Sequence, residues 1–247
     1  MSAPALIALL ATLAAPPSAA GGDGLRIAPY IWIPSITGTI GSEGSDAGLP
    51  PGRLDVNFEE FEENLRLGGA MVNMGWRGNR WVAYGDWTYA NVRTEAPTSR
   101  GTLYSSVEAQ VKGHIVQAFG GYAVLDRPDV KVDLAGGLRG YSLMARLELN
   151  EGALAGRETS GSQLWLDGVA AARVVAHLGE RWDVYLHADV GGGGSNLTWQ
   201  LIGAAGYDFS WGGLFAGWRH LAVDYEKGSF KLDVALSGPI AGATFDL

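Results

Sequence analysis

The segment SVEAQVKGHIV, residues 106–116, alternates between polar and apolar side chains. Polar residues stand at the even-numbered positions from 106 to 114, with Val, Ala, Gly or Ile between them. Because successive side chains of a strand point to opposite faces, this pattern predicts a β-strand with one polar and one apolar face. We place Glu108 and Lys112 on the polar face, toward a lumen, and Val111 on an apolar face toward lipid.

The same alternation recurs over residues 130–140, 163–175 and 182–191. These segments are as long as the about 9–11 residues that a tilted membrane strand needs. A bilayer offers no water to unpaired backbone groups, so spanning strands must close into a barrel. We therefore predict an all-β fold, a closed antiparallel up-and-down transmembrane β-barrel. About ten strands are expected, with eight as the alternative: 24–40, 65–77, 81–93, 104–124, 130–147, 162–177, 182–192, 196–209, 214–225 and 230–247.

The connections between these segments alternate in length. Short polar turns are expected near residues 77–80, 126–129, 179–181 and 210–213, whereas longer polar segments occupy 41–64, 94–103 and 148–162. Outer-membrane barrels show this asymmetry, with short periplasmic turns and longer outer loops. Tryptophan and tyrosine gather near both sets of connections and predict two interfacial belts. The expected members are Trp76, Trp81, Trp182 and Trp211 near the short turns, and Trp87, Tyr89, Trp165 and Trp199 toward the long loops.

The composition narrows the class of protein further. The 247 residues carry a formal net charge of −8 and include no cysteine. The negative charge argues against a nucleic-acid partner, and without cysteine there is no disulfide framework or thiolate site. Only 18% of the residues are charged, below the roughly 25–35% typical of a soluble surface. This favours a membrane barrel over a soluble lipocalin-like binding barrel, and we expect no cofactor and no metal.

The N-terminal residues 1–20, MSAPALIALLATLAAPPSAA, predict a cleavable signal peptide. The apolar run is too short to span a bilayer as a helix, and Ser18-Ala19-Ala20 supplies small residues for cleavage. Residues 21–247 would then form the mature barrel domain in the outer membrane of a Gram-negative bacterium.

Three stretches carry a resemblance to known proteins. The segments APYIWIPSITGTI (28–40), DVNFEEFEENLRLGGAMVNMGWRGNRWVAYGDWTYANV (55–92) and AGWRHLAVDYEKGSFKLDVALSGPIAGATFDL (216–247) resemble a group of small bacterial outer-membrane β-barrel proteins, most of them uncharacterised. The resemblance implies the fold and an outer-membrane location, but no activity. Such barrels typically end on an aromatic residue read by the barrel-assembly machinery, whereas this chain ends Phe245-Asp246-Leu247.

The closing segment changes phase along its length. Leu232, Val234 and Leu236 are even-numbered, whereas Ala243 and Phe245 are odd-numbered. Gly238-Pro239 lies between the two groups, and proline within a strand often marks a bulge. We therefore expect a bulge there that returns both groups to the outer face.

The charged residues of the polar faces are the candidate site. Burying a charge without a partner is costly, so we expect them to pair in the lumen. The predicted network comprises Asp86, Glu108, Lys112, Asp133, Arg139, Asp167, Arg173, His187, Asp189 and Arg219.

The function expected from this network is a structural or narrow, porin-like passive-transport role, with outer-membrane lipid and the barrel-assembly machinery as partners and small solutes as possible cargo. The alternative is a barrel enzyme acting on lipid or peptide. Its best acid–base candidates are His187 and Asp189, but two residues apart on a strand is long for a direct hydrogen bond. No catalytic residue is therefore assigned, and no enzyme is expected.

Overall fold

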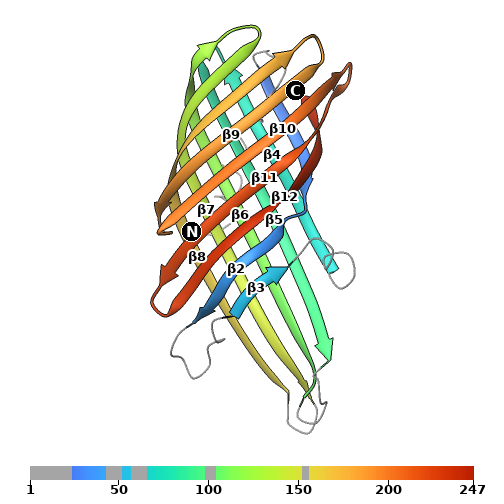
Figure 1. Ribbon diagram of the computed structural model, residues 1–247, viewed down its shortest axis with the longest axis vertical. Coiled ribbons are helices and arrows are strands. Elements are labelled where there is room, and N and C mark those ends of the chain that lie inside the picture. Colours follow the sequence, from blue (N-terminus) through green and yellow to red (C-terminus); the bar gives the residue numbers. More distant parts are fainter. Residues whose placement is uncertain (1–23, 43–51, 57–65, 98–103, 152–155) are drawn as a thin grey trace, which may run out of the picture.

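The structure is a computed structural model that describes residues 24–42, 52–56, 66–97, 104–151 and 156–247, and in this part of the chain the regular structure is all β (Figure 1). The predicted signal peptide, residues 1–20, lies outside the described residues. The strands are β1 (Gly24–Trp32), β2 (Ser35–Ser42), β3 (Gly52–Val56), β4 (Arg66–Gly78), β5 (Trp81–Pro97), β6 (Tyr104–Asp126), β7 (Val130–Glu151), β8 (Arg157–Leu178), β9 (Trp182–Gly193), β10 (Leu197–Phe209), β11 (Gly212–Lys227) and β12 (Phe230–Asp246).

The sheet closes on itself through its first and last strands. β4 to β12 pair in sequence order, and β1 pairs with both β4 and β12. β1 and β2 follow the same register along β12 and form one strand, interrupted at Pro34, which has no N–H to donate. β3 adds only to β2. With β1 and β2 counted together and β3 set aside, the described strands form a closed ten-stranded antiparallel barrel, and the prediction of ten strands is confirmed.

The two ends of the barrel differ in construction. Tight turns join β4 to β5, β6 to β7, β8 to β9 and β10 to β11 at one end, drawn uppermost in Figure 1, and β1 begins and β12 ends there. In the first of these turns Asn79 takes a positive φ of 52°, a conformation that asparagine tolerates. At the other end β6, β7 and β8, of 23, 22 and 22 residues, extend well beyond the 12-residue β9. The part of β5–β8 beyond the other strands is the outer extension.

The outer surface near the short-turn end is apolar. Side chains such as Leu134, Leu138 and Leu186 are 52%, 54% and 48% exposed on this surface. Aromatic residues border it on both sides. Trp76, Trp81, Tyr122, Trp182, Phe209 and Trp211 are exposed near the short turns, and Trp87, Trp199 and Trp218 are exposed farther along.

Trp165 does not belong to the second belt. It is only 8% exposed and lies inside the barrel, stacked between Tyr141 and Tyr225. No helix among the described residues is long and apolar enough to cross a membrane.

β12 pairs with β11 without a register shift, from Gly213↔Thr244 to Lys227↔Phe230. The predicted bulge at Gly238-Pro239 is therefore wrong. Leu232 and Val234 are buried inside the barrel, whereas Phe245 is 40% exposed on the outside. Even-numbered residues of β12 therefore point inward and odd-numbered residues outward along the whole strand. Leu232 and Val234 point inward because the barrel interior around them is itself apolar.

β11 shows the same reversal of polarity within one strand. Near the short turns its inward residue is Arg219, and its outward residues Leu214 and Trp218 are 48% and 54% exposed. Farther along, the inward Leu221, Val223 and Tyr225 are at most 3% exposed, and the outward residues are acidic and exposed: Asp224 and Glu226. The outer surface is thus apolar along one band and polar beyond it.

This reversal corrects the predicted faces of β6. Its inward residues are odd-numbered, with Gln117 and Phe119 buried, whereas the even-numbered Val116 is 49% exposed. Lys112 shares the outward parity, pairs with Asn91 of β5 and lies outside the lumen. Val111 has inward parity, so its assignment to the lipid face is also wrong. Exposure does not follow polarity in this part of β6, where Gln110 of the even-numbered face is 8% exposed and Val111 of the odd-numbered face is 37% exposed, so polarity alone gave the wrong face.

Candidate functional site in the barrel lumen

Six polar side chains join into a closed hydrogen-bonded ring across the lumen at mid-barrel. β5, β6 and β7 place Asp86, Gln117 and Arg139 directly across from one another in register. β9, β10 and β11 supply the other half from the facing wall. The lumen ring consists of Asp86, Gln117, Arg139, Asp189, Gln200 and Arg219.

Each half of the ring repeats one order, arginine to glutamine to aspartate. Arg139 Nε donates to Gln117 Oε1 at 2.8 Å, and Gln117 Nε2 donates to Asp86 Oδ1 at 3.3 Å. Arg219 Nε likewise donates to Gln200 Oε1 at 2.8 Å, and Gln200 Nε2 to Asp189 Oδ2 at 2.9 Å.

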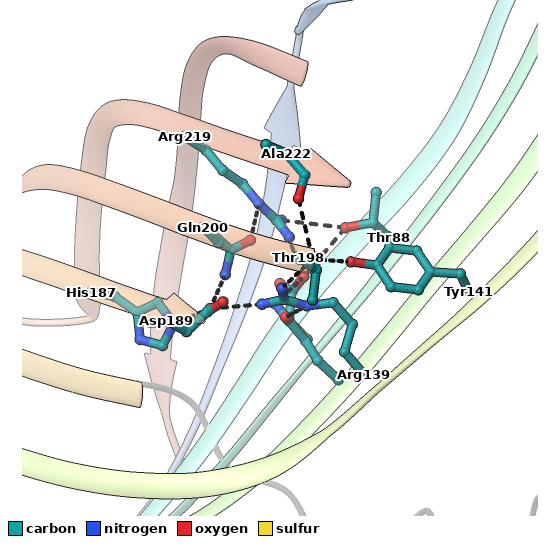
Figure 2. Close-up of polar contacts among 11 residues, drawn as sticks. Thr88, Arg139, Tyr141, His187, Asp189, Thr198, Gln200, Arg219 and Ala222 are labelled. Atoms are coloured by element: carbon teal, nitrogen blue, oxygen red, sulfur yellow. Dashed lines mark hydrogen bonds and ion pairs between the residues drawn. The ribbon is translucent and has the colours of Figure 1, made fainter. Parts of the chain in front are cut away.

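Two ion pairs link the halves. Arg139 Nη2 lies 2.6 Å from Asp189 Oδ2, and Arg219 Nη1 lies 3.1 Å from Asp86 Oδ1. Figure 2 shows Asp189, Gln200, Arg219 and Arg139 in this arrangement. Each charge of the ring therefore has an oppositely charged partner.

His187 joins the ring through Asp189. Its Nε2 lies 2.8 Å from Asp189 Oδ2, the oxygen that also accepts from Arg139 and Gln200. Side chains two residues apart on a strand have here converged, so the sequence-based objection to a His187–Asp189 contact was wrong.

A second charged cluster lies nearer the short turns. Asp133 Oδ2 accepts from Arg77 Nη2 at 2.7 Å and from Arg173 Nη2 at 2.7 Å. Arg173 also lies over the ring of Tyr84, 4.6 Å from its centroid. All three charged side chains are at most 9% exposed, so Asp133 holds two cations between the walls of the lumen.

An aromatic stack covers the ring on the side of the outer extension. Trp165 stacks between Tyr141 and Tyr225, with centroids 4.8 and 4.1 Å away. Ser195, in the β9–β10 connection, is buried, accepts from Trp165 Nε1 at 2.8 Å and donates to Asp167 Oδ2 at 2.7 Å. The stack and this inward-folded connection together fill the lumen above the ring.

The lumen is filled by side chains at this height. Arg139, Gln200 and Arg219 are at most 1% exposed. Because these ring members have so little accessible surface and the aromatic stack lies over them, side chains occupy most of the lumen at mid-barrel.

On the other side of the ring, toward the short turns, the lumen contains a cavity of about 110 Å³. Asp86, Gln200, His187 and Arg219 form its floor, and it extends to Asp208 near the β10–β11 turn. The interior therefore consists of a filled outer half and a partly open inner half.

Eight of the ten predicted residues lie in the lumen, all at most 8% exposed: Asp86, Asp133, Arg139, Asp167, Arg173, His187, Asp189 and Arg219. Asp167 lies across from Arg139 in register, but the contacts that the structure shows for it are with Ser195. Lys112 is outside the lumen, and the Glu108 side chain is outside the described part of the structure.

The uncharged connectors of the network were not predicted from the sequence. Gln117 has the opposite parity to Glu108 and Lys112, so the predicted faces of β6 assigned it to lipid, and the strand of Gln200 carries no residue of the predicted network. The strands of Tyr30 and Arg77 likewise carry no charged residue of the predicted network. Tyr30 accepts from Arg219 Nη1 at 2.6 Å and donates to Asp86 Oδ2 at 2.8 Å, and it comes from the irregular first strand.

A closed barrel with an apolar outer band, aromatic borders and a charged interior is a transmembrane β-barrel, the architecture that spans bacterial outer membranes. The soluble lipocalin-like alternative is wrong, because it requires polar residues where Leu138, Leu164 and Leu166 are exposed.

No protein-family model matches the chain, and no curated protein matches it. Solved structures with a similar fold include Ail, the attachment invasion locus protein of Yersinia pestis, at 13% identity and a TM-score of 0.41, covering 90% of this chain and 99% of that one. The translocator domain of the autotransporter NalP from Neisseria meningitidis is 16% identical with a TM-score of 0.48, covering 92% and 89%. At these values the likenesses identify no family for this chain.

Proposed function

We propose that the chain is a non-conducting integral protein of the bacterial outer membrane with a structural role. The observation that carries the proposal is the lumen ring, whose six side chains pair with one another across the barrel. A barrel built for permeation would leave its charged side chains facing water, whereas Arg139 and Arg219 are at most 1% exposed. The barrel then serves to hold the outer extension of β5–β8 at the cell surface.

The proposal assigns no catalytic step to the barrel. A His–Asp pair acts as a general base only when the free histidine nitrogen faces a nucleophile. His187 Nδ1 has no hydrogen-bond partner in the structure, so no hydroxyl group of the described residues forms a nucleophile–base pair with it.

Conductance across planar bilayers tests the proposal. The wild-type barrel should give no steady open level. The triple variant Arg139→Ala, Asp189→Ala, Trp165→Ala removes one ion pair of the ring and the centre of the aromatic stack, and should open a measurable conductance. Arg181→Ala, in an exposed turn, is the control and should stay closed. A steady wild-type conductance would support the passive-transport alternative and reject a structural role.

A further inference from the structure

We propose that the cavity on the short-turn side of the lumen ring binds a small, neutral molecule that has one ring and one hydroxyl group. Such a ligand would enter from the short-turn end, where Asp208 and Thr244 of the lining are partly exposed. The proposal goes beyond the structural role and does not depend on it, because the cavity lies on one side of the ring whether or not the barrel conducts.

The walls of the cavity suit an apolar ring. Tyr84, Phe119, Tyr185 and Phe215 line it, together with aliphatic residues such as Ile202. Tyr84 and Phe119 already stack on each other, with centroids 4.8 Å apart and planes 21° apart. The volume of about 110 Å³ is several times what one water molecule needs, and it suits a single-ring molecule better than a larger ligand.

Several residues that line the cavity carry a buried polar atom without a hydrogen-bond partner. Arg219 Nη2, His187 Nδ1 and Tyr84 Oη make no hydrogen bond, although these residues are only 1%, 3% and 4% exposed. Leaving a buried donor or acceptor unpaired costs about 1–3 kcal/mol. Asn73 Oδ1, Arg26 Nη1 and Asp183 Oδ2 are unpartnered as well, so six residues of one lining carry such an atom, and a ligand that satisfied some of them would lower this cost.

The donor or acceptor character of each unpartnered atom indicates which polar group the ligand needs. Asp189, as a carboxylate, only accepts, so His187 Nε2 carries its hydrogen and Nδ1 of the neutral ring is an acceptor. Arg219 Nη2 is a donor, and the Tyr84 hydroxyl can act either way. A hydroxyl group both donates and accepts, and therefore suits any of these atoms.

Charge argues for a neutral ligand. The lining contains two arginines, Arg26 and Arg219, and three aspartates, Asp86, Asp183 and Asp208. Arg26 and Arg219 are already paired, with Asp246 and Asp86 respectively. An anionic ligand would find no cation without a partner, and the excess of acidic groups would repel it.

The floor also places apolar surface between the polar groups. His187 pairs with Ile202, and Ile202 pairs with Arg219, across three neighbouring strands. The two unpartnered nitrogens therefore flank an aliphatic side chain, which suits a ring lying over Ile202 with its hydroxyl at one edge.

The test uses p-cresol as the probe, with toluene and benzoate for comparison. Calorimetric titration of the folded barrel in nanodiscs should show saturable one-site binding of p-cresol above the signal of empty nanodiscs. Toluene lacks the hydroxyl and should bind at least tenfold more weakly, and benzoate should not bind. Equal binding of p-cresol and toluene would overturn the assignment of the polar floor.

Matched variants separate the cavity from the lipid. Ala204→Phe fills the cavity that Ala204 lines and should abolish binding, whereas Ala216→Phe, on the exposed outer face of β11, should not change it. Tyr84→Phe removes a hydroxyl that has no protein partner, so the barrel should fold normally and bind p-cresol several-fold more weakly. If p-cresol gives the same signal with wild type, Ala204→Phe and empty nanodiscs, the cavity holds only water and the proposal is wrong.

Discussion

At the scale of single residues, the lumen shows how a barrel accommodates charge away from water. Asp189 Oδ2 accepts from an arginine, a histidine and a glutamine at 2.6, 2.8 and 2.9 Å. Each glutamine of the ring accepts a hydrogen bond from one arginine and donates one to the aspartate that forms the ion pair with the other arginine. Removing one member therefore affects both ion pairs.

Arg139→Met tests this coupling. The substitution leaves Asp189 buried without its cation, and breaking a buried pair costs about 3–5 kcal/mol. Urea unfolding in lipid vesicles should show a loss of that size. The double variant Arg139→Met, Asp189→Leu removes both charges and should recover most of it. Arg181→Met, at an exposed turn, should change the unfolding free energy by less than about 0.5 kcal/mol. A single variant as stable as wild type would show that the ion pair contributes nothing.

The charged members of this network could be predicted because period-two alternation places them on one face of each strand. Arg139 and His187 were found in this way. The glutamine connectors could not be found in this way, because Gln117 lies on the face of its strand that alternation assigned to lipid, and the strand of Gln200 carries no member of the predicted network. Tyr30 lies in a strand interrupted by Pro34, where alternation gives little guidance.

At the scale of strands, the positions of the strands along the chain were predicted well, but the face of each strand that points into the lumen was predicted only in part. Ten segments with the correct order follow from alternation and turn residues. Which face is inside depends on the surrounding solvent, and that changes along a strand. For β9 the polar face is inward, as predicted, whereas in β6 the polar face at Lys112 points outward. The expected bulge in β12 was wrong for the same reason.

Paired arginine substitutions test the assigned faces. Leu186 is 48% exposed in the apolar band, so Leu186→Arg should cost about 2–4 kcal/mol if it faces mid-bilayer lipid. Asp224→Arg has the same outward orientation on the polar surface and should cost less than about 1 kcal/mol. Both are measured by denaturant titration in the same vesicles. Equal costs would contradict a lipid boundary between the two positions.

The aromatic stack offers a test at the scale of packed elements. Trp165 joins β8 to β7 and β11 through Tyr141 and Tyr225. Trp165→Ala should lower the unfolding free energy by about 3–5 kcal/mol, as for other buried aromatic residues. Trp211→Ala, exposed beside a short turn, is the control and should cost less. An equal loss in the two variants would mean that the stack adds nothing beyond interfacial anchoring.

At the scale of the whole molecule, the two aromatic borders match a bilayer. Trp199 and Phe209 lie at opposite borders of β10, and about ten residues of tilted strand cover about 25 Å, the height of an outer-membrane apolar band. The full-length protein expressed in a Gram-negative host should therefore sediment with the outer membrane. Its gel mobility should change on boiling, because a folded barrel migrates as a compact species. A soluble protein with unchanged mobility would contradict the membrane assignment.

The reversed polarity of the outer half also has a kinetic consequence. To reach the far side of the membrane, the exposed charged residues of β11 and β12, among them Asp224, Glu226 and Asp233, must pass through hydrocarbon. Transfer of charged side chains into the bilayer centre is costly, so unassisted insertion should be slow. This fits the proposal that the barrel-assembly machinery inserts the chain. The same cost opposes the return of these charges, so the orientation reached at insertion would be retained for the lifetime of the folded barrel.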